Sequence, residues 1–187
     1  MVILSSLISM LGLIFASILA IIIAIFSVLF IVLEYYVGVI GYIKGAPFVP
    51  SKPGRISTMI ELANIKEGMT AVDLGSGDGS IVIACAQRGA RATGIEMNPF
   101  LIPYSRWRAK RAHVQKNTTF IRGEIQDYSL AHTDIVFVYL LPDLLSRISG
   151  KLSSQLPRGA IVISNAFPIP GWKPTEEKNN VFLYKIE

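Results

Sequence analysis

The sequence begins with a long stretch that has almost no charge, and the whole chain has one cysteine and two histidines. The first 43 of its 187 residues contain one acid, Glu34, and no lysine or arginine. A single cysteine, Cys85, cannot form an internal disulfide, and its apolar neighbours indicate a buried hydrophobic residue. The two histidines have no partners at ligand spacing, so we expect no metal site. With 51% hydrophobic residues, the composition also excludes intrinsic disorder.

The uncharged stretch is predicted to cross a membrane. From Val2 to Leu33, five serines are the most polar residues. About 20 helical residues cross a hydrocarbon core roughly 30 Å thick, so this run is long enough for a transmembrane helix. A cleaved signal peptide would need a basic start and an apolar run of about 7 to 15 residues, and neither is present. A buried core helix is disfavoured, because the remaining 144 residues could hardly surround it.

The distribution of positive charge predicts the topology of the chain. No lysine or arginine precedes Lys44. The positive-inside rule therefore predicts a single-pass protein whose globular part faces the cytoplasm or a matrix-equivalent compartment. The segment Gly45 to Gly54 is rich in proline and glycine and is expected to form no regular element. We therefore expect an anchor over residues 1–43, a hinge over 44–56 and one domain over 57–187.

Short apolar strands alternate with helical stretches throughout the predicted domain. We predict strands at residues 70–74, 92–95, 119–122, 135–140, 160–164 and 181–186, and helices at 57–65, 80–88, 99–113 and 144–155. This alternation is typical of a parallel sheet covered by helices on both faces. The predicted fold class is therefore α/β and Rossmann-like, with a mostly parallel sheet and a ligand at the carboxyl ends of its strands. The short tail after residue 164 leaves room for one further strand.

A glycine-rich turn follows the first predicted strand and opens the next helix. Its sequence is Val72-Asp73-Leu74-Gly75-Ser76-Gly77-Asp78-Gly79. Glycines permit positive φ and let the backbone approach a ligand closely at a helix N-terminus. Glu96 ends the next strand, where an acid can bind both ribose hydroxyls. Asp73 would repel a pyrophosphate but attract the ammonium of a methionine moiety, so S-adenosylmethionine is favoured over a nicotinamide cofactor.

Further cofactor contacts are expected after the second and third strands. Glu124 follows the third strand, where it could accept a hydrogen bond from an adenine amino group. Asp127 competes for that role, and an ordinary surface acid explains Glu124 equally well. The full set of predicted cofactor-binding residues is Asp73, Gly75, Ser76, Gly77, Asp78, Gly79, Glu96, Met97, Asn98 and Glu124.

Several of these motifs resemble class I S-adenosylmethionine-dependent methyltransferases. The resemblance is carried by Asp73-Leu-Gly-Ser-Gly-Asp-Gly79, Gly94-Ile-Glu-Met-Asn-Pro99 and Tyr104-Ser-Arg-Trp-Arg-Ala109. The apolar amino-terminal helix and two proline-containing segments narrow this resemblance to one subfamily. The two segments are Pro47-Phe-Val-Pro-Ser51 and Phe167-Pro-Ile-Pro-Gly-Trp172. The chain is similar to small membrane-anchored protein-lysine methyltransferases acting on the ATP synthase c-subunit and the adenine nucleotide translocase, and to their prokaryotic relatives. It departs from their pattern at Ser80, Met97 and Glu124, where Arg, Leu and Asp are frequent.

The resemblance implies methyl transfer to a lysine, and two residues are predicted to position its amine. A lysine must first lose a proton, because its unperturbed pKa is near 10.4. Apolar walls lower that pKa, and a hydroxyl or carbonyl can orient the amine. Tyr139 lies at the mouth of the fourth predicted strand and Asn165 follows the fifth, although each is equally well explained as a packed strand residue. No Asn-Pro-Pro-Tyr loop follows the fourth strand, which disfavours methylation of DNA adenine or glutamine.

The expected partners are a lipid bilayer and a membrane protein with an accessible lysine, while the oligomeric state stays open. A run of basic residues consists of Arg106, Arg108, Lys110, Arg111 and Lys116. The simplest interpretation of this run is a solvated helix face, and contact with anionic lipid headgroups is the alternative. Nucleic acid is disfavoured because Trp107 is the one aromatic residue interleaved with these cations. Methylation of a lipid or quinone, and a membrane-tethered nucleotide-binding module without turnover, are the alternative functions.

Overall fold

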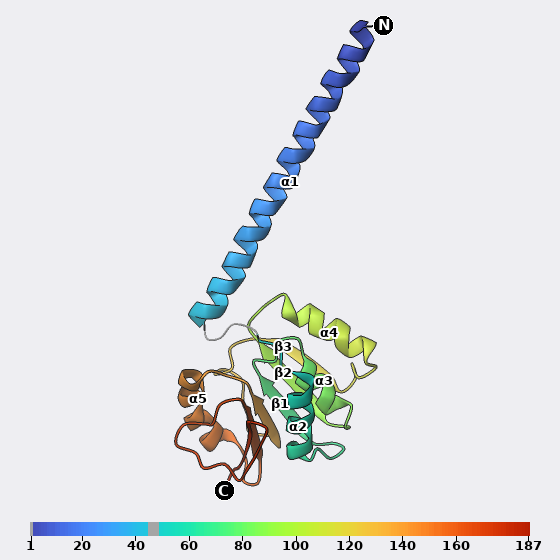
Figure 1. The fold of residues 1–187 in the computed structure, drawn as a ribbon. Coiled ribbons are helices and arrows are strands. Elements are labelled where there is room, and N and C mark those ends of the chain that lie inside the picture. Colours follow the sequence, from blue (N-terminus) through green and yellow to red (C-terminus); the bar gives the residue numbers. More distant parts are fainter. Residues whose placement is uncertain (1, 45–48) are drawn as a thin grey trace. The chain divides into compact units, whose positions relative to one another are not determined.

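The computed structural model describes the backbone of residues 2–44 and 49–187, and the side chains of residues 10–35 and 49–187. The chain divides into two compact units, Met1–Pro47 and Phe48–Glu187. Each unit is described by itself (Figure 1).

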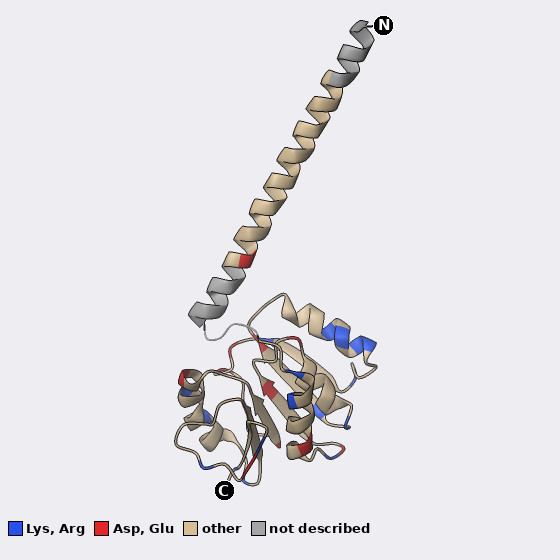
Figure 2. Cartoon of the chain, viewed as in Figure 1, with Lys and Arg blue, Asp and Glu red and all other residues tan. Residues whose placement is uncertain are grey.

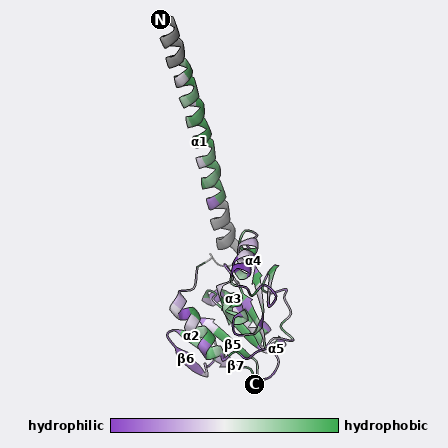
Figure 3. Cartoon of the chain, turned by 90° about the vertical axis from the view of Figure 1, so that its right-hand side faces the viewer, coloured by the Kyte–Doolittle hydropathy of each residue, from purple (hydrophilic) through white to green (hydrophobic). Residues whose placement is uncertain are grey.

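The first unit contains one helix, α1, Val2–Lys44. Within its segment Met10–Tyr35, an 18-residue window has a mean hydropathy of 3.1, and none of that window is buried inside the chain. Glu34 is the one charged residue of this segment, which is strongly hydrophobic along its length (Figures 2 and 3). The Ser17 and Ser27 hydroxyls each donate to the carbonyl four residues earlier, at 2.9 Å, so they need no partner outside the helix. The segment is long and apolar enough to cross a membrane, a property that it shares with signal sequences.

The second unit is built on a seven-stranded sheet. The strand order is β3-β2-β1-β4-β5-β7-β6. The strands are β1 Thr70–Leu74, β2 Arg91–Glu96, β3 Thr118–Arg122, β4 Ile135–Val138, β5 Ile161–Asn165, β6 Glu176–Lys178 and β7 Val181–Lys185. The first five strands pair in parallel, and β7 pairs antiparallel with β5 and β6. The predicted Rossmann-like α/β fold with a mostly parallel sheet is confirmed.

Helices cover both faces of this sheet, as predicted (Figure 1). One face packs against α2 (Pro53–Ala63), α3 (Ser80–Ala86) and α4 (Leu101–Arg111). The opposite face packs against α5 (Pro142–Gln155). Each face of the sheet carries its own hydrophobic core. Successive side chains of a strand point to opposite faces, so Ala71 belongs to the first core and Val72 to the second. Loops complete the cover of the second face through Leu130, Ile169 and Trp172.

The first helix of this unit begins earlier than predicted. Helix α2 starts at Pro53 rather than residue 57, because the first helical position needs no N–H donor and suits the fixed φ of proline. The prediction that Gly45 to Gly54 forms no regular element is therefore wrong at Pro53 and Gly54. Residues 49–52 form no regular element, and residues 45–48 lie outside the described part.

The prediction of one strand after β5 is also wrong, because two short strands form a hairpin. Asn179 and Asn180 connect β6 to β7, with φ of 52° and 54°. Positive φ at both central residues is what a two-residue type I′ turn requires. All three residues of β6, Glu176–Lys178, are exposed, so no apolar alternation marks this strand. The Asn-Asn pair is the signal in the sequence that indicates the turn.

Asn180 tests the contribution of this turn to stability. Asn180→Ala should lower the free energy of unfolding by about 1 kcal/mol, because a Cβ without a polar group is disfavoured at positive φ. Asn180→Gly should leave it unchanged or raise it. Urea unfolding of the detergent-solubilised chain, followed by tryptophan fluorescence, measures both. Equal destabilisation by the two substitutions would contradict the turn assignment.

Candidate active site

Parallel pairing places the predicted site residues along one edge of the sheet. Leu74 pairs with Ile95 on one side and with Val138 on the other. Val138 in turn pairs with Ser164. The residues that follow these positions therefore lie at the same carboxyl edge, and they are Gly75, Glu96, Tyr139 and Asn165.

The glycine loop is fastened to the neighbouring strand. The N–H groups of Gly75 and Ser76 both donate to the Ile95 carbonyl, at 2.9 Å each. Gly79 has a φ of 76°, and a Cβ there would lie 2.7 Å from the Phe120 ring, so glycine is required by both conformation and space. Gly75 also has positive φ, but it is exposed, and a Cβ would meet Leu140 at 3.4 Å. Gly79 is therefore a packing glycine, while Gly75 leaves the backbone open to a ligand.

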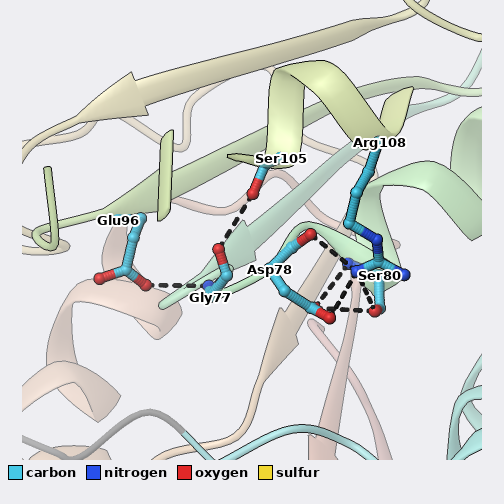
Figure 4. A network of polar contacts seen from close by, with 6 residues as sticks. All are labelled: Gly77, Asp78, Ser80, Glu96, Ser105 and Arg108. Carbon is cyan, nitrogen blue, oxygen red and sulfur yellow. Dashed lines mark hydrogen bonds and ion pairs between the residues drawn. The ribbon is translucent and has the colours of Figure 1, made fainter. Parts of the chain in front are cut away.

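Two backbone donors orient the Glu96 carboxylate toward the loop. One oxygen accepts the Gly77 N–H and the other accepts the Asn98 N–H, at 2.8 Å each. Figure 4 shows the first of these hydrogen bonds. Each oxygen keeps further acceptor capacity for a hydroxyl group. Met97 and Asn98 continue the chain at the same edge and are half-buried, and the Asn98 side chain accepts the Phe100 N–H at 3.0 Å.

Asp73 is a buried carboxyl group at the end of β1 that has no cation beside it among the described residues. It is 7% exposed. Burial raises its pKa to about 8, and the negative charges of Glu96 and Asp78 add to this effect. No hydrogen bond or positive charge from the described part of the chain lowers the pKa. A bound ammonium would favour the ionised form and offset the cost of burying it.

The third acid of the site, Asp78, is used within the protein. Its carboxylate accepts the Ser80 N–H at 3.1 Å and the Ser80 hydroxyl at 2.7 Å. It also forms an ion pair with Arg108 of α4. The Arg108 guanidinium donates to the Asp78 carbonyl at 2.9 Å and to the Ser80 hydroxyl at 2.8 Å (Figure 4). Asp78 and Arg108 thus lock the loop against α4, and a direct contact of Asp78 with the cofactor stays a prediction.

Arg108 is a residue that sequence reasoning missed. The sequence pattern groups it with a solvated basic run, but its side chain is partly buried against the loop. The signal in the sequence that could have indicated this role of Arg108 is Ser80, because the family pattern frequently has an arginine at that position. Since Ser80 carries no charge, Asp78 needs a cation from another element of the chain.

Ser76 contributes to the loop through packing. Its hydroxyl is buried without a hydrogen-bond partner in the described part of the chain. A Cβ added to Gly94 would lie 2.5 Å from this hydroxyl oxygen. Ser76 therefore sits directly over β2, where glycine at position 94 makes room for it.

Asn165 holds the segment that precedes α2. This residue is 1% exposed. Its amide oxygen accepts a hydrogen bond from Arg55 at 3.0 Å, and its amide nitrogen donates to the Ser51 hydroxyl at 3.3 Å. Sequence reasoning missed both partners, which lie more than one hundred residues earlier. Contact of Asn165 with a substrate amine stays a prediction, as it does for Tyr139, which is half-buried directly after β4.

Glu124 lies apart from these contacts. It is exposed and follows β3 by two residues. Its carbonyl accepts the Asp127 N–H at 3.2 Å, and its adenine role stays a prediction.

The geometry fits S-adenosylmethionine. The buried carboxyl group of Asp73 suits an ammonium, the oriented carboxylate of Glu96 suits two hydroxyls, and the open backbone at Gly75 permits close approach.

Comparison of the sequence with protein families agrees with this interpretation. The profile of the ANTKMT methyltransferase domain matches residues 73–176. The chain belongs to this family.

Similar proteins in this family are named as lysine methyltransferases. The lysine N-methyltransferase of Mus musculus that is named for the ATP synthase c-subunit is 38% identical over 128 residues, which cover 68% of this chain and 51% of that protein. The adenine nucleotide translocase lysine N-methyltransferase of Mus musculus is 36% identical, covering 75% of this chain and 63% of that protein. A protein-lysine N-methyltransferase of Saccharolobus islandicus (strain REY15A) is 29% identical, and the match covers 78% of this chain and 96% of that protein. The chain spans about half the length of the first of these mouse relatives.

Solved structures agree with the fold and the cofactor. An RNA methyltransferase from Salinibacter ruber, in complex with S-adenosyl-L-homocysteine, has a TM-score of 0.69 and 34% identity, covering 74% of this chain and 92% of that one. A methyltransferase from Thiobacillus denitrificans with the same ligand has a TM-score of 0.56 at 21% identity, covering 62% of this chain and 49% of that one. This second structure supports the fold alone. The predicted family resemblance and the predicted cofactor, S-adenosyl-L-methionine, are confirmed at the level of the family.

The raised pKa of Asp73 predicts proton release on cofactor binding. Below about pH 8 the free carboxyl group is protonated, whereas an ammonium ligand favours the carboxylate. Binding between pH 6 and 7.5 should therefore release close to one proton and strengthen as the pH rises. Isothermal titration in buffers of different ionisation enthalpy measures the proton count. Asp73→Asn should bind far more weakly and without this release.

The same substitution should change stability in the opposite direction. A carboxyl group whose folded pKa is raised makes the folded state lose stability as the pH rises from about 4 to about 8. Without cofactor at pH 7.5, Asp73→Asn should therefore raise the free energy of unfolding by on the order of 1 kcal/mol. Thermal unfolding across this pH range checks the sign. A less stable variant would show that Asp73 is satisfied within the protein.

Arg108 gives a separate test of the loop. Arg108→Gln leaves Asp78 without its cation, so cofactor affinity should fall about tenfold, the effect of roughly 1.4 kcal/mol. Lys110→Gln removes the same charge from an exposed position of α4 and should leave affinity unchanged. Titration calorimetry measures both variants. Equal losses would indicate a general effect of charge rather than support of the loop.

Proposed function

We propose that this chain is a membrane-anchored, S-adenosylmethionine-dependent protein-lysine N-methyltransferase that acts on a membrane protein. Membership of the family supports the reaction class. The observation that carries the proposal is the pair of acids at the sheet edge. Asp73 is buried without a cation from the described residues, and Glu96 is held toward the glycine loop by two backbone donors.

The cofactor side of the site would work through groups that are already oriented. Bound S-adenosylmethionine would supply a methyl group activated on a sulfonium. Asp73 would hold the ammonium and Glu96 the ribose hydroxyls, while Glu124 is assigned to the adenine. The Gly77 and Asn98 N–H groups fix Glu96 beforehand, so little ordering cost is left for binding.

The substrate side would lie at the ends of β4 and β5. A lysine amine attacks only after its proton has left to water, because the lone pair must be free. We assign Tyr139 and Asn165 to the orientation of that amine. Arg55 and Ser51 hold the Asn165 amide in one orientation, so Asn165 would present a fixed polar group. Half-buried Phe167 and Trp172, which pack against the core beside β5, would limit the access of water.

The relatives and the apolar helix support the substrate class. Two mouse relatives are named for the ATP synthase c-subunit and for the adenine nucleotide translocase, and we propose a membrane protein here as well. Helix α1 would anchor the chain in a bilayer, the residues between Lys44 and Pro53 would join the anchor to the domain, and the unit that begins with α2 would catalyse the transfer. The positive charges after the apolar run favour the cytoplasmic or matrix-equivalent side for the domain.

Labelled cofactor tests the proposed reaction. Native membranes containing the full chain, given S-adenosylmethionine with a labelled methyl group, should gain label in protein, and mass spectrometry should locate it on lysine. Glu96→Gln should reduce the labelling rate by at least tenfold at limiting cofactor, because it weakens binding of the ribose hydroxyls. Glu67→Gln alters an exposed acid outside the sheet edge and should have no effect.

The opposite outcomes identify the other functions. Label that partitions into the organic extract would indicate a lipid or quinone substrate. Folded protein that gives no binding heat with S-adenosylmethionine or S-adenosylhomocysteine would exclude cofactor use. Cofactor binding without any transfer would leave a membrane-tethered binding module.

A further inference from the structure

The positive charge of the globular unit is concentrated in one segment. Residues 97–123 contain six lysines and arginines and no aspartate or glutamate. Elsewhere in residues 44–187 there are twelve bases and twelve acids, so this segment accounts for the whole excess. Helix α4 supplies four of the six bases, and the second half of this helix is a blue region in Figure 2.

The same helix exposes large aromatic side chains on the side opposite its buried residues. The buried residues of α4 are Ile102, Ser105 and Ala109. Phe100, Tyr104 and Trp107 are 59%, 47% and 51% exposed. Spacings of four and three residues place these rings on one face of the helix, and Arg111 follows on that face. An aromatic stripe flanked by cations is typical of a helix that lies in a membrane interface.

The arrangement of the rings favours a lipid surface over a nucleic acid. Tyr104 and Trp107 are stacked on each other, with centroids 5.8 Å apart and planes at 22°. Arg111 lies over the Trp107 ring, 4.9 Å from its centroid. A base-stacking platform needs open ring faces, and these contacts reduce the open face area of Tyr104 and Trp107. An interfacial aromatic residue instead needs an apolar body and a polar tip, both of which remain available.

A hollow beside α4 adds a place for a phosphate group. It has a volume of about 280 Å³ and is lined by Arg106, Gln115, Thr118, Thr119 and Phe120. These residues belong to the same acid-free segment. Arginine, amide and hydroxyl donors match the oxygens of a lipid headgroup.

We propose that a docking surface on α4 holds the domain against the anionic headgroups of a bilayer. The surface consists of Phe100, Tyr104, Trp107, Lys110 and Arg111. The inference rests on the anchor proposed above, because a bilayer that holds α1 keeps the domain within reach across the eight residues between Lys44 and Pro53. Helix α4 begins three residues after Asn98, so docking would also set the distance of the cofactor edge from the headgroups.

Fluorescence quenching by brominated lipids tests this surface in the full chain. Trp172→Phe leaves Trp107 as the single tryptophan. The protein is reconstituted in brominated phosphatidylcholine vesicles, with or without about 30% phosphatidylglycerol. Trp107 should be quenched in the anionic vesicles, and less in pure phosphatidylcholine or at high salt. Lys110→Gln with Arg111→Gln removes two cations, each worth about 1 kcal/mol at a bilayer surface, so docking should weaken about thirtyfold.

A matched pair of substitutions and two further readouts separate the outcomes. Arg147→Gln with Arg158→Gln removes the same charge from exposed positions outside the segment and should leave quenching unchanged. Unquenched Trp107 in anionic vesicles, with α1 still resistant to alkaline carbonate extraction, would overturn the proposal. So would equal losses from both charge pairs, or a Trp107 response to single-stranded RNA but not to vesicles. Methyl transfer to lysine is measured separately, so failure of docking is distinguishable from failure of the proposed activity.

Discussion

The site depends on the attachment of the glycine loop to the second strand. Two consecutive N–H groups, from Gly75 and Ser76, share the Ile95 carbonyl, and the next residue, Glu96, holds the Gly77 N–H. The loop therefore cannot shift along β2 without breaking three hydrogen bonds. Parallel pairing of β1 with β2 on one side and β4 on the other extends this register to the strand ends where we propose that the substrate binds. The positions of Asp73, Glu96 and Tyr139 follow from this arrangement.

The acids at this edge differ in how their charge is stabilised within the protein. Asp73 lies in a buried position near two other acids, which raises its pKa. A neutral residue would be more stable there, but it could not attract an ammonium. Asp78 avoids the same problem because Arg108 neutralises it. The contrast separates Asp73, which we propose to bind an ammonium, from Asp78, which supports the loop.

The sequence predicted the parts of the structure that rest on local pattern. β4 was visible because it is a continuous apolar run and β1 because most of its residues are apolar. The loop was visible because its glycines lie between a strand and a helix. Charged β6 had no such pattern. The contacts of Arg108 with Asp78 and of Arg55 with Asn165 join residues 30 and 110 positions apart. Only the packing of α4 and α2 against the sheet brings them together, and no periodicity within one element reveals that packing.

The sheet ends on one side in β6, whose three exposed residues include two glutamates and one lysine. An edge strand offers unpaired backbone groups to any other chain, and long apolar edges promote aggregation. This edge is short and charged, so it is a poor template for intermolecular pairing. A protein concentrated on a two-dimensional surface meets its own copies often, and such an edge would let it remain dispersed there.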